Sequence, residues 1–128
     1  MHKKIIVIGA LCCALAVALG AFGAHALKSI LTPESLQSFH TATNYQMLHG
    51  IAIVLVGILH ERFPQQLILW AARFFGCGIL SFSGSIYLLT FLKQQAIGYP
   101  TFIVLVTPLG GLLMILGWLC LAWTFLRK

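Results

Sequence analysis

The residues of this chain that could perform chemistry are few, and they are spaced too widely for the common catalytic and metal-binding motifs. Five histidines are present, but no His-Glu-x-x-His pattern occurs. His40 and His49 are nine residues apart, which places them nearly opposite each other on a helix of about 3.6 residues per turn. A metal site would need His25 or another chain to join them. We therefore expect no metal and no other cofactor, and we expect the histidines to lie at interfaces or in hydrogen bonds.

Acidic and thiol groups offer no better catalytic arrangement. The four cysteines lack Cys-x-x-Cys spacing, and the chain contains two acidic residues, neither of them aspartate. Paired-carboxylate catalysis and an acidic proton relay within the membrane are therefore unsupported, and neither a phosphate-binding glycine loop nor a nucleophile elbow occurs. An enzyme would have to rely on His49 or His25 alone. We predict that the protein is not an enzyme.

The densest group of polar side chains enters the second of four apolar segments. Thr43, Gln46 and Gly50 share one helical stripe there, with His49 at its edge. Polar groups surrounded by lipid need partners. Two interpretations are open: a structural hydrogen-bond network that ties this segment to serines of the third segment, or a polar pocket or solute path between the two helices. The candidate residues for either interpretation are His25, Asn44, Tyr45, Gln46, His49, Arg73 and Ser83.

Arg73 is the charged residue that lies deepest in an apolar segment, about 9 Å along a helix from Leu67. A central arginine costs about 2.5 to 3.5 kcal/mol on insertion scales, and less when its side chain reaches the interface. Two alternatives follow: the arginine reaches the interface or pairs with Glu61, or it binds a substrate. We expect the first. Glu61 is the expected partner because the other acid, Glu34, falls across the membrane.

Four long apolar segments must position all of these residues. The chain is 60% hydrophobic and 8% charged, whereas soluble domains are typically about 25% charged. A membrane-spanning helix needs about 20 mostly apolar residues. The sequence therefore predicts an all-α fold, an integral membrane four-helix bundle with an amphipathic interfacial stretch before the second span, in one domain over residues 1–128. The expected spans are residues 5–26, 43–60, 67–92 and 102–126.

Two Thr-Pro pairs mark candidate helix starts. Thr32 is suited to cap a helix that begins with Pro33, and Glu34 suits its first turn. This start predicts the interfacial stretch, which can join the second span as one continuous helix. Thr107-Pro108 lies inside an apolar run, so the fourth span either starts there or continues through with a proline kink.

Small residues at helical spacing predict helix contacts, because close approach holds helices together in lipid. Gly50 with Gly57, and Gly110 with Gly117, are seven residues apart and therefore share a face. One stripe in the first segment is formed by Ala16, Gly20 and Ala24. The glycines expected at helix contacts are Gly20, Gly23, Gly50, Gly57, Gly84, Gly110 and Gly117.

Basic residues predict the orientation in the membrane. Five of them lie on one side of a four-span arrangement and two, Lys28 and Lys93, lie on the other, so both termini are expected in the cytoplasm. The net charge of +6 then reflects topology and attraction to anionic headgroups, not nucleic-acid binding. A cleaved signal peptide is the alternative for the N-terminus, but its apolar run of about 20 residues favours a retained anchor.

Several short motifs, taken together, resemble a known family. They are Gly20-Ala21-Phe22-Gly23-Ala24-His25, Tyr45-Gln46 with His49, Phe82-Ser83-Gly84-Ser85 and Thr107-Pro108-Leu109-Gly110-Gly111. The combination is similar to the YgdD-like family of small inner-membrane proteins of unknown function, a relative of eukaryotic transmembrane protein 256, over nearly the whole chain. Phe91 departs from a glycine in that family. The resemblance implies a multi-pass protein of the bacterial inner (plasma) membrane and supplies no reaction, substrate or catalytic residue.

Two non-enzymatic functions remain, and they belong to different classes. One is a structural or accessory bundle that works through contacts with membrane lipids, further copies of the chain or other membrane proteins. The other is a carrier or channel for a small solute or ion, which would need a homo-oligomer to enclose its path. We expect the first. If Asn44, Gln46, His49 and Arg73 lined one cavity, transport would be favoured, and if they had separate hydrogen-bonded partners it would be disfavoured.

Overall fold

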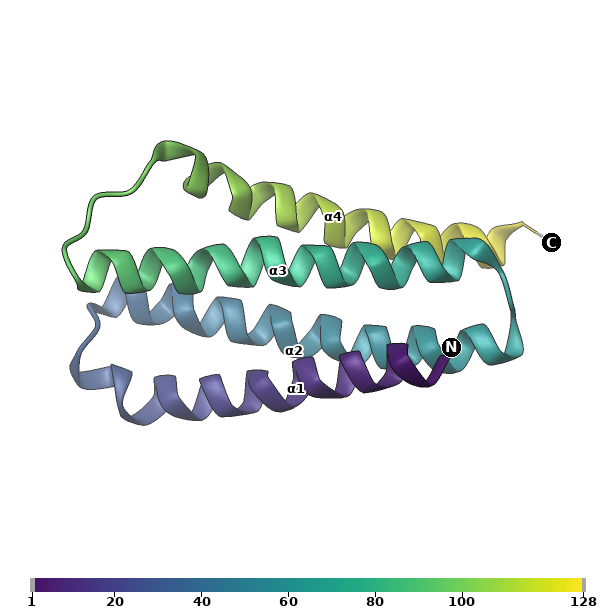
Figure 1. Cartoon of the computed structure of the whole chain (residues 1–128), viewed down its shortest axis with the longest axis horizontal. Coiled ribbons are helices and arrows are strands. Elements are labelled where there is room, and N and C mark those ends of the chain that lie inside the picture. The colour runs from purple at the N-terminus through teal and green to yellow at the C-terminus, as the bar shows by residue number, and fades with distance from the viewer. Residues whose placement is uncertain (1, 128) are drawn as a thin grey trace.

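The computed structural model describes residues 2–127 and consists of four long helices (Figure 1). They are α1 (His2–His25), α2 (Pro33–Arg62), α3 (Gln66–Gln94) and α4 (Thr101–Leu126), and a short 3₁₀ helix, η1 (Leu27–Ser29), follows α1. Each long helix has the length and the apolar composition needed to cross a membrane. The predicted all-α, four-helix membrane bundle is confirmed.

The four helices lie side by side in chain order (Figure 1). Extensive contacts join α1 to α2, α2 to α3 and α3 to α4, so α1 and α4 form the two outer edges of a row. Half of the membrane-length window of α2 is buried, compared with 11% of that of α1, although α2 is the least apolar of the four. This order follows from the lipid environment, because polar side chains need protein partners and apolar ones do not.

Helix α2 begins where the sequence predicts. Thr32 is the N-cap, its Oγ1 accepts a hydrogen bond of 3.2 Å from the backbone N–H of Ser35, and Pro33 is the first helical residue. The helix is 30 residues long, or about 45 Å at helical rise. The interfacial stretch and the second span are therefore one continuous helix, longer than the roughly 30 Å of hydrocarbon in a bilayer.

Helix α4 begins at Thr101 and contains Pro108 in its interior. The fourth helix therefore does not restart at Thr107-Pro108, and the alternative in which it runs through the proline holds. Because proline has no N–H, the backbone carbonyl of Val104 lacks its usual intrahelical donor. In the same turn, Thr107 Oγ1 lies 2.6 Å from Ser85 Oγ on α3, so a contact between helices forms where the α4 ladder is interrupted.

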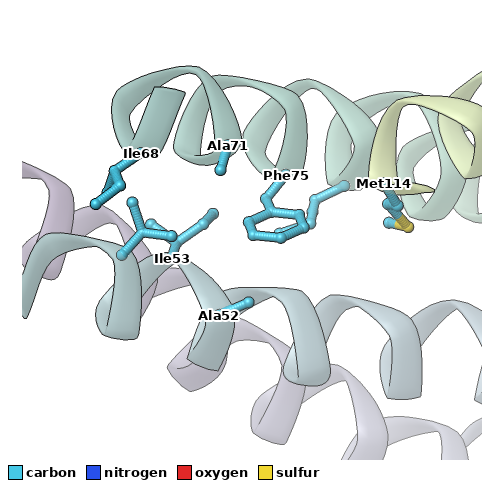
Figure 2. Close-up of a cluster of buried hydrophobic side chains, with 8 residues drawn as sticks. Ala52, Ile53, Ile68, Ala71, Phe75 and Met114 are labelled. Atoms are coloured by element: carbon cyan, nitrogen blue, oxygen red, sulfur yellow. The ribbon is translucent and has the colours of Figure 1, made fainter. Parts of the chain in front are cut away.

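The main apolar core lies between α2 and α3, toward the end of the molecule that carries both termini. Ile53 of α2 packs with Ile68, Ala71 and Phe75 of α3, and Met114 of α4 completes the cluster (Figure 2). Phe75 and Ile68 are fully buried. Because lipid tails are as apolar as leucine, such a cluster stabilises the bundle mainly through close van der Waals packing.

Glycines allow the helices to approach closely at most of the expected positions. A Cβ added at Gly23, Gly50, Gly57, Gly110 or Gly117 would lie within 3 Å of an atom of a neighbouring helix. The expectation is wrong for Gly20 and Gly84, because a Cβ at either position would meet nothing within 4 Å. The buried small residues of α1 are Gly9, Ala16 and Gly23, which are seven apart. Residues spaced by four, such as Ala16, Gly20 and Ala24, are each displaced further around the helix, so they do not all lie on the contact face.

Candidate functional site

Gln46 lies at the centre of the molecule and links three helices. Its side chain is 2% exposed. Its Nε2 donates a 2.9 Å hydrogen bond to the backbone carbonyl of Cys12 on α1, and its Oε1 accepts a 2.7 Å hydrogen bond from the Tyr87 hydroxyl on α3. The two partners fix the orientation of the amide, because the carbonyl can only accept and the hydroxyl here donates. Gln46 is thus a cross-link between helices.

His49 is held between its own helix and α4. Its Nδ1 lies 2.8 Å from the Tyr45 carbonyl, and the Trp118 indole N–H donates to its Nε2 at 3.1 Å. An indole can only donate, so Nε2 accepts and the ring hydrogen is on Nδ1, where it can bond the carbonyl. The side chain is 3% exposed. A metal would need the lone pair of Nε2, which Trp118 already occupies.

Serines of α3 add two connections between helices. Ser83 is buried, and its hydroxyl donates a 2.7 Å hydrogen bond to the Ala42 carbonyl on α2. Ser85 donates to the Phe82 carbonyl of its own helix at 2.9 Å, so Thr107 of α4 supplies the hydrogen of the Ser85–Thr107 bond. Within residues 3–127, no buried side-chain nitrogen or oxygen lacks a hydrogen bond. The buried network, defined as Gln46, His49, Ser83, Ser85, Tyr87, Thr107 and Trp118, thus connects all four helices.

The structure does not bring the rest of the expected polar set into this network. His25 and Asn44 are exposed. Asn44 and Gln46 are two residues apart, which turns their side chains about 200° from each other on a helix. Tyr45 is 43% exposed and packs its ring against Phe82, at 4.7 Å between centroids, beside His49. Asn44 and His25 are therefore surface groups.

Arg73 lies apart from the network, on the exposed side of α3. Its guanidinium carbon is 4.7 Å from the centroid of the Trp70 ring, one turn earlier on the same helix. Pairing with Glu61 was one of the two arrangements expected, and among the described residues the guanidinium has this cation–π contact instead. Arg73 also lies within the first turns of α3, where a long side chain can reach the membrane interface. That its side chain reaches the interface stays a prediction.

Three members of the buried network were not predicted from the sequence. Thr107 was considered only as a helix start, and it bonds to Ser85. Tyr87 and Trp118 supply the donors for Gln46 and His49, and they are 41 and 69 residues distant from those partners. Their residue types alone could have indicated that both take part in buried hydrogen bonds. Buried tyrosine hydroxyls and tryptophan N–H groups usually find acceptors, so either residue in the middle of an apolar segment indicates a polar partner nearby.

A second polar region is an open groove between α2 and α4, with α3 as its floor. A cavity of about 490 Å³ is lined by residues that include Glu34, Thr41, Thr90 and Lys93. It lies at the end of the molecule where α4 is splayed away from α3 (Figure 1). A more apolar cavity of about 610 Å³ follows it, and Pro108 lines both. Polar groups of three helices thus face open space together in this groove.

The site residues contain no recognisable catalytic arrangement. Over residues 3–127, whose side chains the structure describes, no three histidine, cysteine or glutamate side chains are placed to hold a metal ion. The four cysteines are free, and Cys13 makes a weak 3.8 Å contact from its Sγ to the Met47 carbonyl. The geometry therefore provides cross-links between helices and a groove that could bind a molecule.

Comparison with known proteins assigns the chain to a family. A family model described as "Protein of unknown function (DUF423)" matches residues 19–111. The chain is 38% identical over 123 residues to a UPF0382 membrane protein of Haemophilus influenzae, covering 96% of this chain and 94% of the relative. It is 37% identical over 119 residues to UPF0382 membrane protein SH2409 of Staphylococcus haemolyticus, covering 93% and 92%. It is 35% identical over 118 residues to UPF0382 membrane protein YwdK of Bacillus subtilis, covering 91% of each. No solved structure matches the chain.

The matches cover almost the full length of each of these relatives. Their description as membrane proteins agrees with the four membrane-length helices described above. The chain therefore belongs to the DUF423 family of membrane proteins of unknown function.

Proposed function

We propose that this protein is a non-catalytic accessory bundle of the bacterial inner membrane that acts through contacts with lipids or other membrane proteins. The observation that carries the proposal is the division of the expected polar residues. Gln46 and His49 are buried, and each uses its polar atoms in hydrogen bonds to other helices or to its own backbone. Asn44 and Arg73 lie on exposed surfaces away from them.

A carrier or channel for a small solute or ion would need polar groups that face a common wet path. The buried network offers none, because its members are paired with one another or with backbone groups. His49 lines the apolar part of the groove, but both of its ring nitrogens have partners. The groove itself opens to the side of a single chain, so it would enclose a path only in an oligomer.

The proposed orientation places both termini in the cytoplasm. The termini and the α2–α3 connection lie at one end of the molecule, and the other two connections lie at the opposite end (Figure 1). The end that carries both termini has more basic residues than the opposite end, and an excess of lysine and arginine is typical of cytoplasmic segments. We also infer that the YgdD-like proteins and transmembrane protein 256 are relatives within the same family.

Two measurements on the same variants test the accessory function. Gln46→Ala and His49→Ala should lower the thermal unfolding temperature in mild detergent by several degrees, because each leaves buried donors or acceptors without partners. Asn44→Ala, an exposed neighbour, is the matched control and should leave it unchanged. In proteoliposomes, the wild-type protein should carry no ion or solute flux above protein-free vesicles.

The two interpretations fail differently in these measurements. Unchanged unfolding temperatures in both buried variants would contradict a structural network. A wild-type flux that Gln46→Ala or His49→Ala abolishes, with unfolding unchanged, would favour the carrier or channel.

A further inference from the structure

The two cavities between α2 and α4 are successive parts of one groove. Most of the α2 residues that line them follow a spacing of four and three residues, which keeps them on one helix face. These residues are Glu34, Ser38, Thr41, Tyr45 and Leu48, and Ser35 and His49 line the cavities beside them. On α4, Val104, Pro108 and Ile115 keep the same periodicity. Fourteen residues separate Glu34 from Leu48, so the groove is about 21 Å long at helical rise.

The groove changes from polar to apolar along its length. Its outer part, near the α1–α2 and α3–α4 connections, is lined by one carboxylate, one ammonium group and the hydroxyls of serine and threonine residues. Its inner part is lined mainly by apolar and aromatic side chains, among them Leu48, Phe82, Leu112 and Ile115. A phospholipid in a bilayer leaflet has the same order, with its headgroup at the membrane surface and its acyl chains toward the centre.

Two opposite charges stand in the outer part and come from different helices. Glu34 lies in the first turn of α2, and Lys93 lies in the last turn of α3. A zwitterionic headgroup carries an ammonium and a phosphate, so Glu34 suits the ammonium and Lys93 suits the phosphate. Ser38 and Thr90 add hydroxyls that can donate to phosphate oxygens. An anionic headgroup without an ammonium would meet Lys93 but would also face the carboxylate of Glu34.

We propose that this groove binds one zwitterionic phospholipid of the phosphatidylethanolamine class, with the headgroup between Glu34 and Lys93 and an acyl chain along the apolar part. The inference deepens the proposed accessory function by naming a partner, and it rests on that function. Gln46 does not line the groove, whereas His49, Thr107 and Trp118 of the buried network form part of its wall. Trp118 marks the inner end of the groove, where its indole is bonded to His49.

Native mass spectrometry of the full chain released from mild detergent tests the headgroup assignment. The probes are phosphatidylethanolamine and phosphatidylglycerol with identical acyl chains. We expect one phosphatidylethanolamine per chain, retained about three- to fivefold more than phosphatidylglycerol, the ratio that one exposed charge pair can supply. Glu34→Gln should remove this preference, and Lys93→Gln should lower retention of both lipids. Glu61→Gln and Lys28→Gln change the same charges outside the groove and should alter neither.

A filled groove tests the acyl-chain assignment. A Cβ at Gly111 would meet only Phe82, at 3.8 Å, which is ordinary contact. Gly111→Leu should therefore fold and occupy the apolar part of the groove, and the fraction of chains that retain lipid should fall at least threefold. Gly84→Leu, where a Cβ would meet nothing within 4 Å, is the matched control and should retain lipid. Thermal unfolding of both variants verifies that they are folded.

Several outcomes would overturn this inference. They are equal retention of the two lipids by the wild type, an unchanged preference in Glu34→Gln, and full retention in a folded Gly111→Leu. Any of these results, with the buried network still required for stability, would leave the accessory function in place. Solute flux in proteoliposomes would instead overturn the accessory function itself.

Discussion

Both faces of α2 carry polar residues, but the two faces have different surroundings. On the inner face, Gln46 is buried and bonded to α1 and α3, and His49, at the edge of this face beside the groove, is buried and bonded to α4. On the outer face, Glu34, Ser38 and Thr41 line an open groove. The difference arises because α1 and α3 cover the inner face closely, whereas α4 is splayed from its neighbours beside the outer one (Figure 1). The packing of neighbouring helices, and not residue type, thus determines which polar groups act as cross-links.

The difference between the two faces depends on the close approach of α4 to α3 beyond the splayed end. Substitution of Gly110 should disrupt this α3–α4 contact. A Cβ at Gly110 would lie 2.8 Å from Phe82 Cα, a backbone atom that cannot move alone. Gly110→Ala should therefore lower the free energy of unfolding by about 1 to 3 kcal/mol. Gly84→Ala, with no neighbour within 4 Å, should raise it by about 0.5 to 1 kcal/mol, because glycine weakens a helix interior. Denaturation in mild detergent measures both, and shifts of the same sign would contradict the assigned packing.

A double-mutant cycle between Gln46 and Tyr87 sharpens the description of the inner face. Gln46→Leu and Tyr87→Phe each remove one side of the 2.7 Å hydrogen bond. We expect a coupling free energy of about 0.6 kcal/mol, with about 1.7 kcal/mol as the upper range for such bonds in membranes. Ser38→Ala on the outer face should change stability by less than about 0.5 kcal/mol. Additive effects of the first two substitutions would show that the bond does not stabilise the bundle.

Removal of the Trp118 donor tests the link between the two faces. Trp118→Phe keeps an aromatic ring but leaves Nε2 of buried His49 without its donor, which should cost about 1 kcal/mol of unfolding free energy. Nitrogen NMR of labelled histidine should show His49 with its hydrogen on Nδ1 in the wild type and a changed Nε2 signal in the variant. An identical Nε2 signal in both proteins would refute the Trp118–His49 bond.

A further prediction concerns the turn that ends α3. Ala96 has a φ of 53°, the backbone N–H of Ile97 bonds to the Leu92 carbonyl at 2.9 Å, and that of Ala96 bonds to the Lys93 carbonyl at 3.2 Å. This is a Schellman motif with alanine in the left-handed position that usually holds glycine. Ala96→Gly should therefore stabilise the protein by about 0.5 to 1 kcal/mol in thermal denaturation. A destabilised variant would mean that the alanine methyl contributes contacts that outweigh its strain.

The sequence predicts the fold far better than it predicts the site. The helices depend on signals between residues near each other in the chain, whereas the site depends on contacts between residues far apart in the chain. The apolar segments and the cap at Thr32 are local signals that act over a few residues or one helix, and the structure confirms the four helices and the start of α2. The helical stripe through Gln46 is also a local property. Its partners are not, since Cys12 and Tyr87 are 34 and 41 residues away.

The lateral order of the helices is the information that the sequence lacks. Lipid surrounds every span, so no strong hydrophobic force ranks one helix pairing above another. Gly9 at the α1–α2 contact and Trp118 beside His49 become meaningful only once the row of helices is known. The same reason explains why Gly20 and Gly84 are not at helix contacts although their local sequence suggested it.

The unequal lengths of the helices have a consequence for the membrane around the protein. The inner pair, α2 and α3, has 30 and 29 residues, whereas α1 and α4 have 24 and 26, so the inner pair is longer by about 5 to 9 Å at helical rise. A bilayer that matches the outer helices is too thin for the inner ones, which must then tilt or protrude from its surface. Bilayer thickness therefore sets how far Glu34 and Lys93 stand above the hydrocarbon, and thickening the acyl region draws both charges toward it.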